Sequence, residues 1–393
     1  MIYEFILLFI YYLYHIILIL NLNTLTPLQI AYDLATTITT IEGPYFATIL
    51  VPNSLLTITL KRPPPVFFLL SDIHTGRSKC DVCKTNEGCY SLYTPSTFMK
   101  FNNEYAIKYS IQTDLLTESW FDEETRQMTL DVGWSFEGTH NSALKDVIYS
   151  NKPCMSHNKT SCPLPNMRIH MGDTRQIDIF TKKYNGDMLL SYLPHNESIE
   201  FLLSLPIITV DMITRYKKML QDNFPDFEPD YIIRFLQKIL TYELYSFDYF
   251  NEPFVQKYSR TYHEWIQLPE FIRNTFYERG IDLYGKKLII SRYKIKIINR
   301  VMECIITNKE CTSDIKTDPS ITMFMADIYT ISRSLKTFRN GLPSQVSIIY
   351  LGGSHIDVIM YLLEPFYTSV KSYGTQDVVT EDVFVANANK CIT

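Results

Sequence analysis

The sequence predicts an α/β fold, in which helices flank a central, mostly parallel sheet and a helical insertion precedes the last strand. Two observations lead to this prediction. Short apolar segments that end at a polar or glycine-containing turn are typical of buried strands, and they occur both early and late in the chain of 393 residues. Between them, apolar residues recur at spacings of three and four, which is typical of amphipathic helices.

Four segments have the composition of buried strands. The first follows Pro63, Pro64 and Pro65, which mark a boundary because proline fits neither a helix interior nor a central strand. The first and the last are wholly or mostly apolar and stop at a polar or glycine turn. The expected strands are residues 66–70, 111–118, 167–171 and 347–351, and a terminal helix is expected after the last of them.

A helical region is expected between the third and fourth strands, over residues 209–340. Because the last strand must return to join the earlier ones, residues 22–393 are expected to form a single domain. Residues 133–165 contain several prolines and are interpreted as a surface insertion. The clearest helix is marked by apolar residues at helical spacing, namely Tyr231, Ile232, Phe235, Ile239 and Leu240.

Residues 1–21 form an apolar N-terminal segment. From Phe5 to Leu20 the only polar groups are His15 and three tyrosine hydroxyls, so this run approaches the length of about 20 residues that spans a bilayer. No lysine or arginine precedes Lys61, so the positive flank that orients membrane helices and begins signal peptides is absent. A membrane anchor, an uncleaved signal and a buried helix all remain open.

Composition and charge favour a folded protein that does not bind nucleic acid through a broad basic surface. The apolar fraction of 46% and the charged fraction of 20% are typical of a globular chain. The formal net charge is −5, and no run of lysine and arginine is longer than a pair. Nucleic-acid binding by a basic patch is therefore not indicated.

The first candidate site residues are Asp72 and His74, which follow the apolar strand at residues 66–70. Residues two apart in an extended chain face the same way, so both side chains can point into one site. Ligands bind at the strand ends of α/β sheets, and a carboxylate beside an imidazole suits a divalent metal or an acid/base pair. The alternative is a polar turn in which Asp72 caps a neighbouring amide.

His355 follows the last expected strand in a similar way. Gly352 and Gly353 allow a tight turn, and Ser354 with Asp357 resembles a capping box, which predicts a helix beginning at His355. The positive end of that helix favours the neutral imidazole, which is the form that binds metals. The alternative is an ordinary strand, turn and helix with an incidental histidine.

Two further strands supply charged residues. Glu118 ends the strand at residues 111–118, where a solvated carboxylate is the alternative to a functional one. Arg168 and His170 lie on one face of the next strand, and Asp173 and Arg175 follow it. These four residues predict a site for an anionic group of a substrate, and the alternative is a structural network of salt bridges.

Cys80, Cys83 and Cys89 cluster within ten residues. Two cysteines at the spacing Cys-x-x-Cys can bind one zinc ion, and Cys89 could be a third ligand. In an oxidising compartment the same residues would form disulfides instead. The sequence leaves both outcomes open.

Taken together, these segments resemble an uncharacterised protein family of large DNA viruses with no established activity. The resemblance implies a location in the host cell or the virion, anchored to a membrane where residues 1–21 act as an anchor. The segments that carry it are residues 72–74, residues 80–89, Glu118, residues 168–175, and the pattern Asp327-x-Tyr329-x-x-x-Arg333.

Two enzyme families resemble parts of this pattern. The TraB/TIKI and ChaN-like group carries two Gly-x-x-His motifs and a glutamate on an α/β core, and some members are metal-dependent proteases. Gly352 to His355 fits that motif, whereas Ser71 stands in the place of glycine before His74. Calcineurin-like phosphoesterases begin with Asp-x-His after an apolar strand, as at Asp72, but their later histidine motifs are absent here.

These observations combine into a hypothesis of metal-dependent hydrolysis of an unknown substrate. A divalent metal ion would activate water, with Glu118, His74 and His355 as catalytic groups and Arg168 or Arg175 holding the substrate. The alternatives are a calcineurin-like metallophosphoesterase and a non-enzymatic, membrane-tethered viral structural or interaction protein. Whether the chain is an enzyme stays open. The expected metal ligands are Asp72, His74, Glu118 and His355.

Overall fold

A computed structural model provides the structure of the chain. It describes residues 25–42, 45–60, 62–72, 89–91, 95–117, 164, 166–171, 207–211, 213–214, 217–218, 226–241, 243–244, 246–285, 292–309, 315–316, 320–336 and 343–374. The apolar segment at residues 1–21 lies outside this part, and so does nearly all of the insertion expected at residues 133–165. Among the described helices, none is both long and apolar enough to cross a bilayer.

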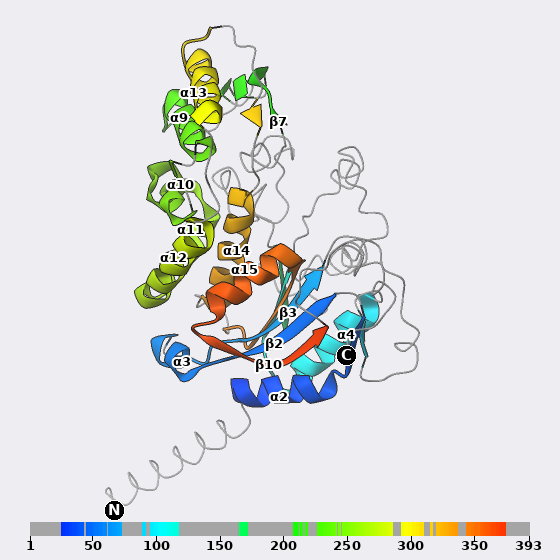
Figure 1. The fold of residues 1–393 in the computed structure, drawn as a ribbon. Coiled ribbons are helices and arrows are strands. Elements are labelled where there is room, and N and C mark those ends of the chain that lie inside the picture. The colour runs from blue at the N-terminus through cyan, green and yellow to red at the C-terminus, as the bar shows by residue number, and fades with distance from the viewer. Residues whose placement is uncertain are drawn as a thin grey trace, which may run out of the picture.

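The centre of the molecule is a six-stranded mixed sheet, and the predicted α/β class is confirmed (Figure 1). Strands β3, β9, β5 and β6 are parallel to one another, whereas β2 is antiparallel to both β3 and β10. In spatial order the strands are β10 (Tyr367–Gly374), β2 (Phe46–Pro52), β3 (Val66–Asp72), β9 (Val346–Gly352), β5 (Thr113–Thr117) and β6 (Met167–Met171).

The four parallel strands coincide with the four segments expected from the sequence. Their apolar residues are buried on both faces because helices cover both sides of the sheet. The strand at residues 346–352 is not the last one, however, because β10 follows the helix after it. Strand β10 was not predicted, since it lies at the sheet edge and most of its residues are polar or partly exposed.

One face of the sheet is covered by α2 (Pro27–Thr37) and α4 (Pro95–Lys108). Helix α2 begins with a capping box, in which the Thr26 hydroxyl accepts a hydrogen bond from the amide of Gln29 and the Gln29 side chain accepts one from the amide of Thr26. Its buried residues include Ile30 and Leu34, which pack in one core with Phe68 of β3.

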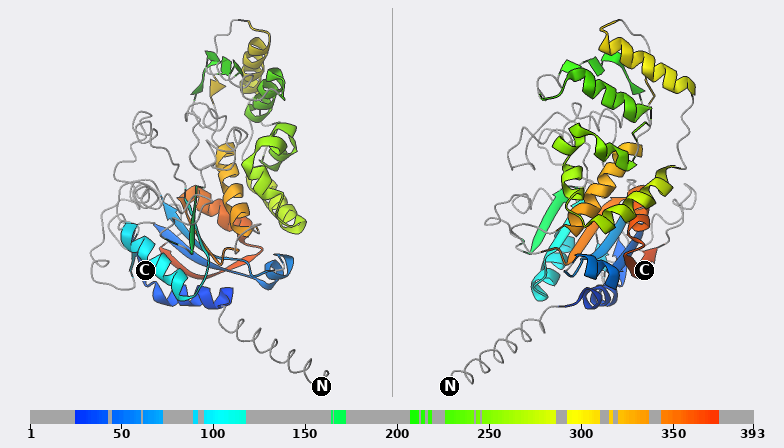
Figure 2. Two further views of the ribbon diagram at one scale, coloured as in Figure 1. Left: turned by 180° about the vertical axis from the view of Figure 1, so that it is seen from behind. Right: turned by 90° about the vertical axis from the view of Figure 1, so that its left-hand side faces the viewer.

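The opposite face is covered by α14 (Ser320–Leu335) and α15 (Gly353–Leu363), and the helical region predicted before β9 packs on the same side (Figure 1). Within that region, α9 and α13 lie farthest from the sheet, as Figure 2 shows from two further directions. The region contains α9 (Pro229–Leu240), the 3-10 helix η6 (Ser246–Asn251), α10 (Pro253–Tyr258), α11 (Arg260–Trp265), α12 (Glu270–Gly285) and α13 (Arg292–Ile306).

Shorter elements complete the described fold. Helix α3 (Ser54–Leu60) joins β2 to β3, and it places Leu56 in the core of the α14 and α15 side. Strand β1 (Thr40–Glu42) pairs in parallel with β4 (Cys89–Ser91). In the helical region, β7 (Ile207–Ile208) pairs antiparallel with β8 (Ile315–Lys316), which joins the two ends of that region.

Candidate functional site

Strands β3 and β9 bring the two histidine motifs to the same end of the sheet. The two strands are parallel neighbours, and the Cα atom of Asp72 is the register partner of Gly352. The segment that leads to His74 therefore departs beside the segment that leads to His355. His74 itself lies outside the described residues, and so does the side chain of Asp72, so their approach to His355 stays a prediction.

Helix α15 begins earlier than the capping box predicted. Gly353 is its first residue, Gly352 is the N-cap, and no side chain caps the helix. The predicted start at His355 with Ser354 as the cap is therefore wrong, because β9 runs straight into the helix without an intervening loop. Ser354 is the second residue of α15, and His355 lies in its first turn.

His355 is held by a carboxylate from the neighbouring helix. Its Nδ1 atom lies 2.7 Å from Oδ1 of Asp327 in α14. Asp327 is 0% exposed and His355 is 8% exposed, so the contact is shielded from water. A buried carboxylate that accepts the Nδ1–H proton fixes both the tautomer and the orientation of the ring, and it directs the Nε2 lone pair away from α14.

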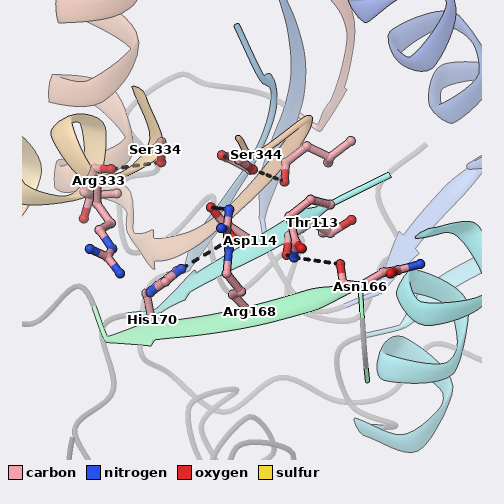
Figure 3. Close-up of polar contacts among 12 residues, drawn as sticks. Thr113, Asp114, Asn166, Arg168, His170, Arg333, Ser334 and Ser344 are labelled. Carbon is pink, nitrogen blue, oxygen red and sulfur yellow. Dashed lines mark hydrogen bonds and ion pairs between the residues drawn. The ribbon is translucent and has the colours of Figure 1, made fainter. Parts of the chain in front are cut away.

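A second buried cluster lies on β5 and β6, where Asp114 contacts both Arg168 and His170 (Figure 3). Arg168 donates from Nε to one oxygen of Asp114 and from Nη2 to the other, the latter at 3.0 Å. His170 Nε2 lies 3.4 Å from Oδ1 of Asp114. Arg168 is the register partner of Asp114, and His170 is two residues further along the same face.

Burial and neighbouring charges set the charge of this cluster. Burial acts to raise the pKa of the Asp114 carboxyl, but His170 and Arg168 lower that pKa well below its ordinary range. Burial lowers the pKa of His170 to about 4, and the charge of Arg333 acts in the same direction, against the effect of Asp114. His170 is therefore neutral at pH 7, and Arg168 is the cation that keeps Asp114 ionised.

Helix α14 is fixed to its surroundings by charged side chains at its C-terminal end. Arg333 donates from Nη1 to Glu264 of α11 at 2.8 Å, and Lys336 donates to the same carboxylate. Arg62 binds the main-chain carbonyl oxygens of Leu335 and Lys336. These bonds satisfy carbonyl groups that a helix end leaves without intrahelical partners. Since α14 also carries Asp327, they hold the partner of His355 in place.

The predicted substrate-binding residues are described only in part. Arg168 uses two nitrogen atoms to bind Asp114, which is the arrangement that the structural alternative predicts. Asp173 and Arg175 lie outside the described residues, as do Glu118, Cys80 and Cys83. A substrate role for these residues stays a prediction.

Two carboxylates that organise these clusters, Asp114 and Asp327, have weaker signals in the sequence. Asp114 is the charged residue of an otherwise uncharged strand, and a buried charge there is costly unless a cation pairs with it. The free-energy cost of burying Asp114 therefore indicates a cationic partner on an adjacent strand. Asp327 was present in the viral resemblance, but nothing in the spacing between residues 327 and 355 indicates that the two side chains meet.

The described residues alone do not assemble a complete metal site. Among them, no three or more His, Cys, Asp or Glu side chains gather closely enough to hold a metal ion. Of the four expected ligands, only the His355 side chain belongs to the described part. Cys89 forms a disulfide bond, which is the outcome expected of the cysteine cluster in an oxidising compartment.

Comparison of the chain with protein-family models, with curated proteins and with solved structures finds no match. The fold and the geometry of the two clusters are therefore the basis for any functional proposal.

Proposed function

We propose that this protein is a metal-dependent hydrolase of the TraB/TIKI-like type, encoded by a large DNA virus, with its centre where β3 and β9 end. The observation that supports the proposal is the buried contact of 2.7 Å between His355 Nδ1 and Asp327 Oδ1. Carboxylates commonly bind the far nitrogen of metal-ligating histidines, where they orient the ring and increase its basicity. The same arrangement also suits a general base.

Different residues of this chain would orient the metal ligands and bind the metal ion. Asp327 accepts the Nδ1–H proton and keeps His355 in one tautomer. His355 lies in the first turn of α15, directly after the carboxyl end of β9, and the carboxyl ends of parallel strands are where α/β proteins bind ligands. We propose Asp72, His74 and Glu118 as the remaining ligands. A divalent metal ion, when bound, lowers the pKa of water and so supplies a nucleophile near neutral pH.

Metal analysis of the purified full chain tests the proposal. The wild-type protein is expected to retain a divalent metal after dialysis, and His355→Ala is expected to lose it. Asp327→Asn is expected to weaken metal affinity by about 10- to 100-fold, because it removes the charge that supports the ligand. His263→Ala, at an exposed histidine of α11, is the matched control and is expected to retain the metal.

Equal metal content in the wild type, His355→Ala and His263→Ala would contradict the metal site. So would a wild-type protein that binds no metal at any pH at which it is folded.

The alternative is a membrane-tethered viral structural or interaction protein, and the Asp114 cluster favours it. Arg168 binds both oxygens of a fully buried carboxylate, and Arg333 and Lys336 converge on Glu264. Such contacts join β5 to β6 and α11 to α14, as a structural network of salt bridges does. If this alternative is correct, the His355→Ala variant differs from the wild type in stability but not in metal content.

A further inference from the structure

We propose that the N-terminus of α15 binds a phosphate group through the amide groups of Gly353 and Ser354 and the hydroxyl of Ser71. The three groups meet where β9 passes into the helix, beside the end of β3. This inference does not depend on a metal ion or on hydrolysis, because the two amides and the hydroxyl belong to the protein itself.

The first turn of α15 offers donors without an internal acceptor. The helix spans eleven residues, its N-cap is Gly352, no side chain caps it, and no acidic residue lies in its first turn. Among the described residues, the amides of Gly353 and Ser354 donate to no acceptor. The helix dipole places partial positive charge at this end, which favours an anion there.

Ser71 is the second and independent observation. Its side chain is 1% exposed, and within the described part of the chain its Oγ atom has no hydrogen-bond partner. A buried hydroxyl without a partner is costly, and native proteins contain few of them. Oγ faces the helix end, since it lies 3.3 Å from the position that a Cβ atom on Gly353 would occupy.

The lack of a side chain at Gly353 lets the hydroxyl of Tyr45 approach the helix end closely. A Cβ atom there would lie 2.1 Å from the hydroxyl oxygen of Tyr45, so any other residue would displace that side chain. The hydroxyls of Tyr45 and Ser71 therefore both lie against Gly353, in the first turn of α15. A phosphate group has enough acceptor oxygens to bind several such donors at once, whereas a carboxylate has only two.

Isothermal titration calorimetry of the full chain in neutral detergent with inorganic phosphate tests this site. A chelator in the buffer removes any contribution from metal ions. Wild-type protein is expected to bind phosphate, and Ser71→Ala is expected to bind it about tenfold more weakly, the effect of one hydrogen bond to a charged group. Thermal unfolding without phosphate is expected to show that Ser71→Ala is as stable as the wild type or more stable, because a hydroxyl without a partner is removed.

Ser347→Ala is the matched control. Ser347 is a buried serine on the adjacent strand β9, but its hydroxyl lies 3.2 Å from that of Ser344. This variant is expected to keep its phosphate affinity and to lose stability. A titration with phenyl phosphate shows which kind of molecule carries the phosphate group. Tighter binding of the ester indicates a phosphate carried on a larger molecule, and tighter binding of the free anion indicates inorganic phosphate.

Three results would overturn the inference: wild-type protein that binds no phosphate, Ser71→Ala with wild-type affinity, or equal affinity for acetate and phosphate. Metal content measured on separate samples without the chelator keeps the two proposals separate. Retained metal without phosphate binding contradicts only the anion site, and phosphate binding without metal contradicts only the hydrolase.

Discussion

Within the described residues, two buried carboxylates contact a histidine, and the two contacts differ in the other partner of the carboxylate. At the sheet, Asp114 is bound by two nitrogens of Arg168, and His170 lies 3.4 Å away as a neutral ring. Between α14 and α15, Asp327 makes a contact of 2.7 Å with Nδ1 of His355. The first carboxylate is bound by a permanent cation, whereas the second contacts an imidazole ring.

This difference separates a stabilising role from a chemical one. A carboxylate bound by arginine cannot change its charge near neutral pH without a large cost, so the Asp114 cluster is suited to hold strands together. A carboxylate bound to imidazole tunes the second ring nitrogen. We therefore expect substitutions at Asp114 to act mainly on stability and substitutions at Asp327 to act mainly on binding.

The largest expected effect is that of Arg168→Met. It leaves the charge of Asp114 buried without its cation, so the free energy of unfolding is expected to fall by about 3–5 kcal/mol. Urea-induced unfolding measures the change. The double variant Arg168→Met with Asp114→Leu is the control, and it is expected to recover most of the stability because no charge is left buried. Equal stability of Arg168→Met and the wild type would show that the pair contributes nothing.

The pH dependence of stability is the next effect. The pKa of His170 is lowered to about 4 in the folded protein, from 6.5 as its ordinary value. The unfolded chain thus binds more protons between these values, and stability is expected to fall as the pH falls from 6.5 towards 4, by about 3 kcal/mol at most. Asp114 acts in the same direction only below its ordinary pKa of 3.8.

Thermal unfolding from pH 7 to pH 4 measures this dependence. His170→Gln is expected to remove the part of the slope that lies between pH 6.5 and 4, while His263→Gln, at an exposed ring, is expected to leave it unchanged. An identical slope in His170→Gln and the wild type would show that His170 is not the group that titrates.

The smallest expected effect is that of Asp327→Asn on stability. An asparagine oxygen can still accept the Nδ1–H proton of His355, so the loss is expected to be about 1 kcal/mol. Asp114→Asn is expected to cost several times more, by about 3–5 kcal/mol, because Arg168 then stays buried without a counter-charge. Chemical denaturation of the two variants compares them directly. If Asp327→Asn proves the more damaging of the two, the roles assigned to the two carboxylates are reversed.

The parts of the fold that the sequence predicts are those with local signals. Strands β3 and β9 are predictable because each is short, largely apolar and stops at a polar or glycine-containing turn, whereas β5 and β6 mix apolar and polar residues and carry a weaker signal. Strand β10 is not predictable in this way, because it lies at the sheet edge, most of its residues are polar or partly exposed, and a bulge interrupts its pairing with β2.

The site is less predictable than the strands, because its contacts join segments that are far apart in the sequence. Arg168 and His170 could be placed on one face from alternation alone, and both indeed contact Asp114. The pairing of β5 with β6 that brings Asp114 to them depends on register across a long stretch of chain, as the packing of α14 on α15 does for Asp327 and His355. No local pattern specifies which carboxylate reaches which imidazole.

The place of β9 between β3 and β5 affects how the protein can be made. The ribosome synthesises β9 long after both of its neighbours, so a growing chain holds two half-sheets that nothing yet joins. Each half-sheet exposes a strand edge that can pair with another molecule. The pairing of strands that are distant in the sequence is also slow, so these edges stay exposed for longer. A chain that stops short of Val346 lacks the strand that unites the halves, so correct folding depends on the completion of synthesis.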